Sequence, residues 1–174
     1  MRIVGGSRRG TRIFAPKGRD TRPTSDRVRE AAFGILGDVD DLAVLDLFAG
    51  SGALGLEALS RGAASATFVE SDPAALEAIE RNLAKLELEG ARVVRSDAMK
   101  HLAGTTERYD LVFLDPPYEM VESLRMPLAE HLPRVLAEGG FVVFETAAGS
   151  RPELPLSVHS TRRHGSAQLT VFEA

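Results

Sequence analysis

The chain has 174 residues, of which 44% are hydrophobic and 26% charged, and its formal net charge is −4. This suits one globular domain, and no apolar run approaches the roughly 20 residues that a membrane-spanning helix needs, so we expect no membrane partner. The absence of cysteine excludes disulfides, thiolate metal sites and a cysteine nucleophile. The histidines lack metal-ligand spacing and the N-terminus lacks an apolar signal core, so we expect no metal and a cytoplasmic location.

The first 30 residues are basic, although the whole chain is acidic. They carry nine basic and three acidic groups, a net charge of +6, whereas the other 144 residues carry 12 basic and 22 acidic groups, a net charge of −10. Such asymmetry favours contact with nucleic acid over a merely solvated arm. We expect residues 1–22 to form a basic arm that contacts nucleic acid, with candidate contacts at Arg2, Arg8, Arg9, Arg12, Lys17, Arg19 and Arg22.

The N-terminal segment begins with two short β-type runs at residues 2–4 and 11–14. Glycines separate them, which predicts a small β-hairpin. A charged connection containing prolines follows, and a helix is predicted over residues 25–36, where Thr24 or Ser25 can cap it and apolar residues recur at helical spacing. We therefore expect an arm over residues 1–22 and a catalytic domain over residues 23–174.

From residue 43 onward, strand-like and helical segments alternate. The predicted strands cover residues 43–48, 66–69, 91–95, 111–114 and 141–145, and residues 158–163 and 169–172 predict a final antiparallel hairpin. The predicted helices cover residues 54–61, a segment capped by Asp72-Pro73, a short turn at 99–102, and a segment near 127–136 that ends at Gly139-Gly140. This alternation predicts an α/β fold with a mostly parallel sheet covered on both faces.

Acidic residues lie where the predicted strands end. Asp46, Glu70, Asp97 and Asp115 each stand at or just beyond a strand. Ligands of such sheets bind at the carboxyl ends of the strands, near the point where the strand order reverses. We expect these acids to meet at one ligand site.

A glycine loop follows the first of these strands. Gly50, Gly52 and Gly55 have the spacing G-x-G-x-x-G, and Glu70 lies twenty residues after Gly50. The pattern is typical of a dinucleotide site, with the acid on the ribose hydroxyls. It fits an S-adenosylmethionine site equally well, and a close-packed turn without a ligand is the third interpretation.

Three features favour S-adenosylmethionine. Asp46 interrupts a strand that is usually apolar in dinucleotide sites, and its carboxylate can organise the loop and meet the methionine amino group. Hydride transfer would need a substrate domain, for which the chain has no room. The third feature is the sequence Asp115-Pro116-Pro117-Tyr118 at the end of an apolar strand.

This Asp-Pro-Pro-Tyr sequence suits methyl transfer to an exocyclic, conjugated amine, which is a poor nucleophile. Asp115 and the carbonyl of Pro116 can accept the two amine N–H bonds, and the prolines hold that carbonyl rigidly. The Asp115 carboxylate also stabilises positive charge on the nitrogen, and Tyr118 offers a face for stacking. A base must be flipped out or unpaired to reach such a pocket. A structural proline turn is the alternative.

Together these residues resemble the ribosomal small subunit methyltransferase D family of 16S rRNA guanine-N2 methyltransferases. The likeness includes Arg2–Gly6, Arg22-Pro23-Thr24 with residues 26–30, the loop through Gly62, Glu70-x-Asp72, Asn82-Leu83, Asp97-Ala98 and residues 115–118. It implies a class I methyltransferase fold with a seven-stranded sheet, S-adenosyl-L-methionine as donor, and a 16S rRNA guanine in an assembled or partly assembled 30S subunit as target. Arg8, Gly34, His164 and Phe172 depart from the family pattern.

The resemblance also implies which residues bind the cofactor. Glu70 would bind the ribose and Asp97 the adenine amine, while Thr24 and Arg27 would border the cofactor or the base. The remaining residues expected in the cofactor site are Asp46, Phe48, Gly50, Ser51, Gly52, Gly55, Ser71 and Ala98. No interface signature is present, so we expect a monomer.

Other functions remain compatible with parts of this pattern. A DNA adenine-N6 methyltransferase uses the same Asp-Pro-Pro-Tyr but usually carries a larger recognition region, and protein-amine methyltransferases generally have Asn where this chain has Asp115. A cofactor-binding RNA assembly factor without turnover is an alternative from a different class, against which Asp115 and Tyr118 argue.

Overall fold

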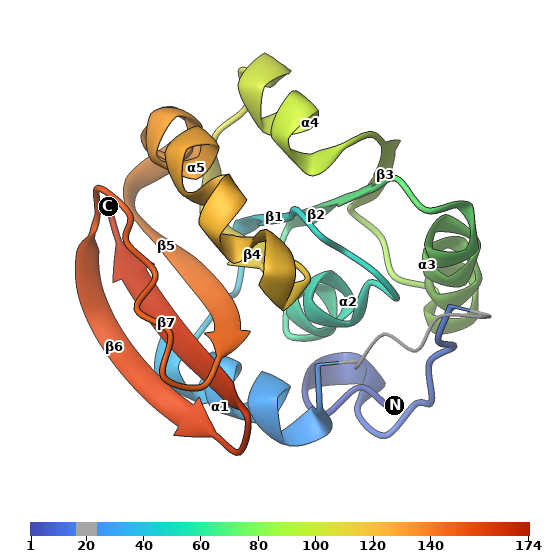
Figure 1. Cartoon of the computed structure of the whole chain (residues 1–174). Helices are drawn as coiled ribbons and strands as arrows, with labels where there is room; N and C mark the ends of the chain where they lie inside the picture. The colour runs from blue at the N-terminus through green and yellow to red at the C-terminus, as the bar shows by residue number, and fades with distance from the viewer. Residues whose placement is uncertain (17–23) are drawn as a thin grey trace.

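The computed structural model describes residues 1–16 and 24–174. Within this part of the chain, seven strands form one sheet in the order β3-β2-β1-β4-β5-β7-β6 (Figure 1). The strands are β1 (Ala43–Asp46), β2 (Ser65–Glu70), β3 (Ala91–Arg95), β4 (Tyr109–Leu114), β5 (Leu136–Ala147), β6 (Ser157–His164) and β7 (Ala167–Glu173). The first five are parallel to one another, and β7 pairs antiparallel with both β5 and β6. The strand order reverses between β1 and β4, which makes this the expected ligand position.

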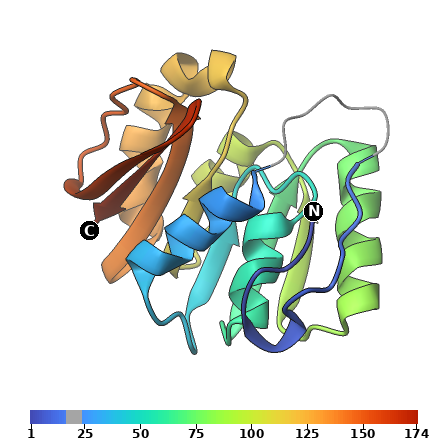
Figure 2. The same cartoon turned by 90° about the horizontal axis from the view of Figure 1, so that it is seen from below.

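Helices cover both faces of the sheet. One face carries α1 (Asp26–Leu36), α2 (Ala53–Ser60) and α3 (Pro73–Leu86), and the other carries α4 (Ala98–Gly104) and α5 (Val121–Val135) (Figures 1 and 2). Two 3-10 turns complete the fold, η1 (Gly6–Arg8) and η2 (Tyr118–Met120). The α/β class, the mostly parallel sheet and the C-terminal antiparallel hairpin expected from the sequence are confirmed. No helix in the described part is long and apolar enough to cross a membrane.

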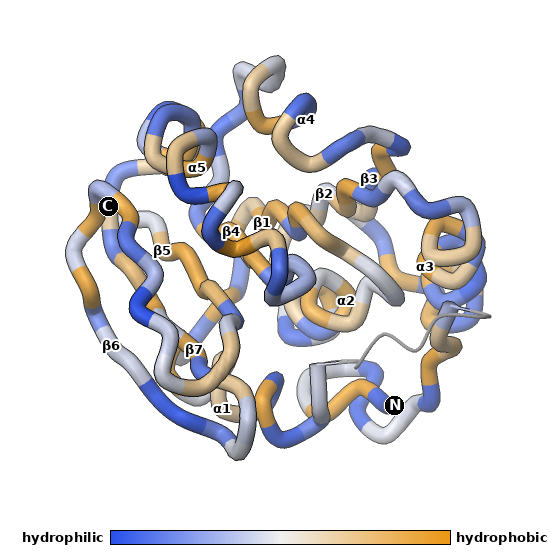
Figure 3. Tube along the Cα trace, viewed as in Figure 1, coloured by the Kyte–Doolittle hydropathy of each residue, from blue (hydrophilic) through white to orange (hydrophobic). Residues whose placement is uncertain are grey.

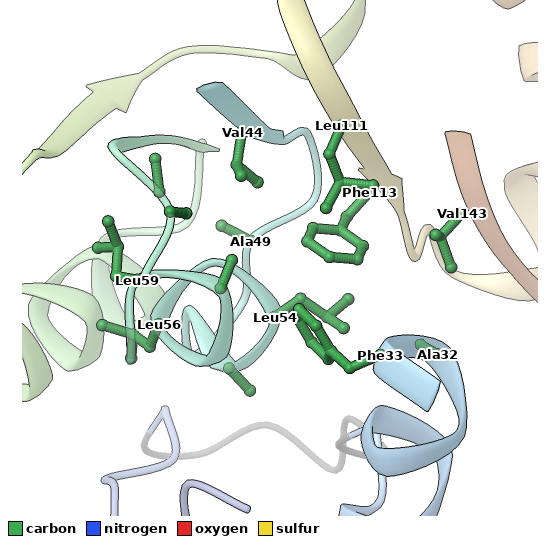
Figure 4. Packing of buried hydrophobic residues seen from close by; sticks show 14 of the residues in the cluster. Ala32, Phe33, Val44, Ala49, Leu54, Leu56, Leu59, Leu111, Phe113 and Val143 are labelled. Atoms are coloured by element: carbon green, nitrogen blue, oxygen red, sulfur yellow. The ribbon is translucent and has the colours of Figure 1, made fainter. Parts of the chain in front are cut away.

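The sheet separates two apolar cores. Hydrophobic residues concentrate along the central strands, whereas the outer helix surfaces are polar (Figure 3). On the α1 face, Phe33 packs against Phe113 of β4 with their ring centroids 5.7 Å apart, and Leu54 of α2 lies beside them (Figure 4). Burying a side chain of this size stabilises the fold by about 1.5–3 kcal/mol. This packing fixes α1, and therefore the residues just before it, against the end of β4.

The predicted N-terminal β-hairpin is wrong. Residues 1–14 contain a single isolated antiparallel bridge between Arg2 and Arg12, with hydrogen bonds such as Ile3 N to the Thr11 carbonyl (3.0 Å), and no strand of the sheet. The 3-10 turn η1 occupies the position of the expected hairpin connection. The segment lies across α2 and beside α3 instead of projecting from the domain (Figure 2).

Side chains of α2 and α3 hold this segment against the domain. Glu57 accepts from the backbone N–H of Val4 at 2.9 Å, and Asn82 accepts from that of Phe14 at 2.7 Å. These backbone groups are thereby satisfied by helix side chains rather than by a partner strand. Ile3 is fully buried in the core of the α1 face. The N-terminal segment is therefore part of the packed domain.

The helix predicted near residues 127–136 differs at both ends. α5 begins six residues earlier, because Pro127 lies inside the helix rather than in its first turn, and α5 ends at Val135. Gly139 and Gly140, expected to end the helix, lie within β5, where the pairing with β4 shifts register. A Cβ atom at Gly140 would lie 3.1 Å from the Asp110 carbonyl, so glycine permits this close strand approach.

Candidate active site

A cavity of about 680 Å³ lies at the carboxyl ends of the central strands. This size is within the range of small-molecule sites, roughly 300–1,000 Å³. Its walls come from the loops after four successive strands of the sheet and from the N-terminal segment. Among the predicted site residues, the cavity is lined by Thr24, Phe48, Gly50, Ser51, Glu70, Ser71, Asp97, Ala98, Asp115, Pro116, Pro117 and Tyr118.

The glycine loop forms one wall of the cavity and packs closely on the sheet. Gly52 has φ +80°, a backbone conformation that glycine adopts readily. A Cβ atom at Gly55 would lie 2.4 Å from a ring carbon of Phe68 on β2. Gly52 and Gly55 thus lie behind the cavity wall, where they permit the strand-to-helix turn.

Asp46 organises this loop from beneath. Its side chain is 1% exposed, and it accepts a hydrogen bond from the backbone N–H of Gly55 at 3.1 Å. Burial, together with the nearby charges of Asp115 and Glu70, raises the pKa of Asp46 to about 7, although the Gly55 N–H favours the ionised form. The hydrogen bond to Gly55 agrees with the predicted role of Asp46 in the loop. Asp46 is not among the described residues that line the cavity, so its contact with a methionine amino group stays a prediction.

Glu70 is held rigidly at the end of β2. One carboxylate oxygen accepts from the backbone N–H of Gly50 at 2.9 Å, and the other accepts from those of Ser71 and Asp72 at 2.8 and 2.9 Å. The carboxylate therefore connects the glycine loop to the start of α3 and lines the cavity. A carboxylate offers about four acceptor positions, so Glu70 can also accept from ligand hydroxyls.

Asp97 and Ala98 form the wall beyond β3. Asp97 caps α4, accepting from the backbone N–H of Lys100 at 2.9 Å, and both residues line the cavity. This position suits the adenine end of a nucleoside whose ribose lies at Glu70.

Asp115 lies directly after β4, on the opposite side of the cavity. Burial raises the pKa of Asp115 to about 6, although a side-chain hydrogen bond from the Thr24 hydroxyl favours the ionised form. The carboxyl group thus titrates close to neutral pH. Thr24, predicted from the family likeness to border the cofactor or base, contacts Asp115, the residue predicted to be catalytic.

Tyr118 and Glu145 complete this side of the cavity. The Tyr118 ring is 37% exposed, and its hydroxyl donates to Glu145 at 3.4 Å. Glu145 is 7% exposed and also lines the cavity. Glu145 was not among the residues predicted for the site. The sequence does contain one indication of it, because an acid follows the apolar run before Glu145 just as Asp115 follows the apolar run before it.

Arg29 was also missed. It is 0% exposed and lies in α1, where it donates to the carbonyls of Thr24 (2.6 Å) and Arg2 and to the Asp26 carboxylate (2.8 Å). One guanidinium thus fixes the segment before α1 and the chain end together. Arg27, predicted as a cofactor residue, is not among the described residues that line the cavity.

Four of the predicted RNA contacts lie in the described N-terminal segment. Arg9 and Arg12 are exposed, Arg2 forms a surface ion pair with Asp26, and Arg8 donates to the Glu87 carbonyl at 3.3 Å. The other three, Lys17, Arg19 and Arg22, lie outside the described residues. Met1 and Pro16, at the two ends of this segment, line the cavity. The arginines therefore belong to a segment that borders the candidate active site.

Known proteins share this sequence and fold. The family model described as conserved hypothetical protein 95 matches residues 1–173. "Ribosomal RNA small subunit methyltransferase D" of Escherichia coli (strain K12) is 45% identical over 146 residues, which cover 83% of this chain and 71% of that protein. The chain belongs to the ribosomal RNA small subunit methyltransferase D family. The family resemblance drawn from the sequence is thereby confirmed.

Further comparisons agree with membership of this family. The protein of the same name from Haemophilus influenzae is 37% identical over 123 residues, covering 68% of this chain and 64% of that protein. The solved structure of hypothetical protein TTHA0928 from Thermus thermophilus is 34% identical, covers 100% of this chain and 99% of that one, and superposes with a TM-score of 0.87. The chain is an rRNA methyltransferase of this family.

Proposed function

We propose that this chain transfers a methyl group from S-adenosyl-L-methionine to the exocyclic N2 amine of one guanine in 16S rRNA. The substrate would be an assembled or partly assembled small subunit in the cytoplasm, with the protein acting as a monomer. The E. coli relative carries the name of an rRNA small subunit methyltransferase. The arrangement that carries the proposal is a single cavity with the Glu70 carboxylate on one side and Asp115 with Tyr118 on the other.

The chemistry of the cavity fits S-adenosylmethionine. Glu70 would hold the ribose hydroxyls, Asp97 the adenine amine, and the loop around Gly50 the methionine part. When bound, this cofactor supplies an electrophilic methyl group on a sulfonium sulfur. Because Glu70 is fixed by three backbone N–H groups, its acceptor atoms are oriented before the cofactor arrives.

The reacting amine would be oriented by Asp115 and Pro116. The Asp115 carboxylate accepts one N–H bond and the Pro116 carbonyl the other, so that the nitrogen lone pair points toward the cofactor. The negative charge of Asp115 stabilises the positive charge that develops on nitrogen as the new C–N bond forms. Because the pKa of Asp115 is raised to about 6, this carboxylate can also take the proton that the nitrogen loses afterwards.

A helical base cannot reach this cavity, so the target guanine would be unpaired or flipped out and stacked on Tyr118. The arginines of residues 1–12 border the cavity and would contact the RNA phosphates. We retain residues 1–22 as the RNA-contacting region of the protein in this proposal, and residues 23–174 as the catalytic region.

The test is methylation of small subunits that lack this modification. Wild-type protein and Asp115→Asn are each incubated with labelled S-adenosylmethionine and such subunits, and the RNA is digested to nucleosides for mass analysis. We expect N2-methylguanosine at one position with wild type and none with the variant, while the variant still binds S-adenosylhomocysteine in calorimetry. A parallel incubation replaces the subunits with unmodified duplex DNA. Methyladenosine in that DNA, or cofactor binding without transfer to either nucleic acid, would overturn the proposal in favour of an adenine methyltransferase or a non-catalytic assembly factor.

A further inference from the structure

Glu145 lies beside the catalytic acid in the sheet. β4 and β5 are parallel, and Leu114 pairs with Phe144, so Asp115, directly after β4, is the neighbour of Glu145 in the last part of β5. Strands in a sheet lie about 4.8 Å apart. Phe113 and Val143, two residues earlier in each strand, both belong to the core of the α1 face. Since side chains alternate along a strand, Asp115 and Glu145 are directed toward that same face.

The position of Glu145 is unusual for a carboxylate. β7 pairs on its other side, with Leu169 opposite Glu145, so the residue lies within the sheet and not at its edge. It is 7% exposed, yet it lines the cavity and receives the Tyr118 hydroxyl at 3.4 Å. Burying a charged group is costly, so a carboxylate at this position of the cavity wall is more than a space-filling residue. Accepting from Tyr118 does not prevent this carboxylate from accepting from a base as well, because it offers about four acceptor positions.

Guanine presents a row of donors on the edge that carries the reacting amine. Its ring N1–H lies next to the N2 amine, so a base whose N2 is held at Asp115 places N1–H toward a neighbouring acceptor. Adenine differs at this position, because its N1 is an acceptor adjacent to the N6 amine. Enzymes that flip a base read this Watson–Crick edge by hydrogen bonds.

We infer that Glu145 selects guanine by accepting a hydrogen bond from the ring N1–H of the flipped base. This inference rests on the proposed function and adds the residue that distinguishes guanine from adenine. The Asp-Pro-Pro-Tyr sequence alone orients any planar exocyclic amine, whether of guanine or adenine. Glu145 excludes adenine because the N1 lone pair would face a carboxylate oxygen, and Tyr118 both stacks on the base and orients Glu145.

The analogue 2-aminopurine isolates the contact, because it keeps the 2-amine but has a lone pair at N1 in place of N1–H. Small subunits are reconstituted with 16S rRNA that carries guanine or 2-aminopurine at the position found by the labelling experiment. Initial methylation rates are compared for wild type, Glu145→Gln and Glu138→Gln. The control Glu138 is an exposed glutamate on the same strand, near its other end.

Wild type should prefer guanine over 2-aminopurine. Glu145→Gln, whose amide can donate to N1, should lower this preference by about 5- to 150-fold, the equivalent of roughly 1–3 kcal/mol at about 1.4 kcal/mol per tenfold. Glu138→Gln should keep the wild-type preference. The difference in intrinsic reactivity between the two amines is the same for every variant, so it cancels when the guanine-to-2-aminopurine rate ratios of two variants are compared. A merely structural role of Glu145 would therefore leave this ratio unchanged. The fluorescence of 2-aminopurine gives a second readout, since Glu145→Gln should bind the analogue-containing subunit more tightly than wild type does.

Equal affinity of wild type and a folded Glu145→Gln for the subunit that carries 2-aminopurine would overturn the inference. A folded Glu145→Gln with the wild-type preference, as judged by its thermal unfolding and cofactor binding, would also overturn it. Both results leave guanine methylation intact. The failure of the proposed function is a different result, namely that wild-type protein transfers no methyl group to guanine-containing subunits.

Discussion

Replacing Thr24 with valine should shift the pH dependence of methyl transfer. Valine keeps the shape of threonine but removes the hydroxyl that donates to the Asp115 carboxylate. That hydrogen bond favours the ionised form, whereas burial disfavours it and raises the pKa of Asp115 to about 6. Without the donor, burial is no longer opposed by this hydrogen bond, so the pKa of Asp115 rises further. Because the reaction needs the carboxylate, the acidic limb of the rate profile moves to higher pH.

The size of the shift follows from the strength of one charge-assisted hydrogen bond. Such a bond contributes about 1.5–3 kcal/mol, and one pKa unit corresponds to about 1.36 kcal/mol. Thr24 is only half-buried, so we take the lower end, about one unit. At pH 6 the ionised fraction of Asp115 would fall from about one half to about one tenth, a roughly fivefold loss of rate. At pH 9 Asp115 is almost fully ionised in both proteins, and this loss disappears.

The assay is kcat/KM for methylation of small subunits between pH 5 and 9, which reports the ionisation of the free enzyme. Ser25→Ala is the matched control, because Ser25 is the adjacent hydroxyl residue and caps α1 by accepting from Val28 N at 3.2 Å. It should lower stability by about 1 kcal/mol without moving the acidic limb. If Thr24→Val lowers the rate by the same factor at every pH, Thr24 affects only positioning and the assignment of this hydrogen bond to the pKa of Asp115 is refuted.

Three further predictions concern the cofactor, the loop and the RNA. Glu70→Ala should weaken S-adenosylhomocysteine binding by about 1–3 kcal/mol, and an unchanged calorimetric affinity would contradict ribose binding at Glu70. Gly55→Ala should lower the free energy of unfolding by about 1–3 kcal/mol in denaturant titrations, because the new methyl group would lie 2.4 Å from the Phe68 ring; wild-type stability would disprove this close packing. Arg9→Gln with Arg12→Gln should reduce the slope of log affinity for subunits against log salt by about 0.7–0.9 per lost phosphate contact, whereas an unchanged slope would mean that neither arginine contacts phosphate.

The alternation of apolar strands and amphipathic helices was sufficient to predict the sheet and its covered faces. The prediction failed where tertiary contacts outweigh local pattern. The β-type runs around Ile3 and Ile13 bury these side chains in the core of the α1 face, and side chains of α2 and α3 accept from the N–H groups of Val4 and Phe14, so that only an isolated bridge joins the two runs. Gly139 and Gly140, typical of a helix end, instead permit the shifted approach of β5 to β4. Local chemistry does not distinguish these outcomes.

The candidate site was predictable where a motif lies at the end of a strand. Glu70 and Asp115 were placed correctly at one cavity because parallel strands bring their carboxyl ends to one edge of the sheet. The buried position of Arg29 could not be predicted, because a buried arginine is recognisable only from the acceptors around it. Two of these acceptors are backbone carbonyls, which any residue could supply. Glu145 follows an apolar run as Asp115 does, but its place beside Asp115 depends on the register between β4 and β5, which the sequence does not specify.

The contacts of Arg29 change how the N-terminal segment should be tested. Deleting residues 1–20 would seem to separate RNA contact from cofactor binding, but Met1 and Pro16 line the cavity and Ile3 is fully buried. The deletion would also remove the Arg2 carbonyl from the guanidinium that holds Thr24, the donor to the catalytic acid. It would therefore disturb the core, the cavity and Asp115 together, and a loss of activity would say nothing about RNA. Neutralising the exposed arginines Arg9 and Arg12 leaves these contacts in place, which is why the salt dependence of binding is the informative measurement for this segment.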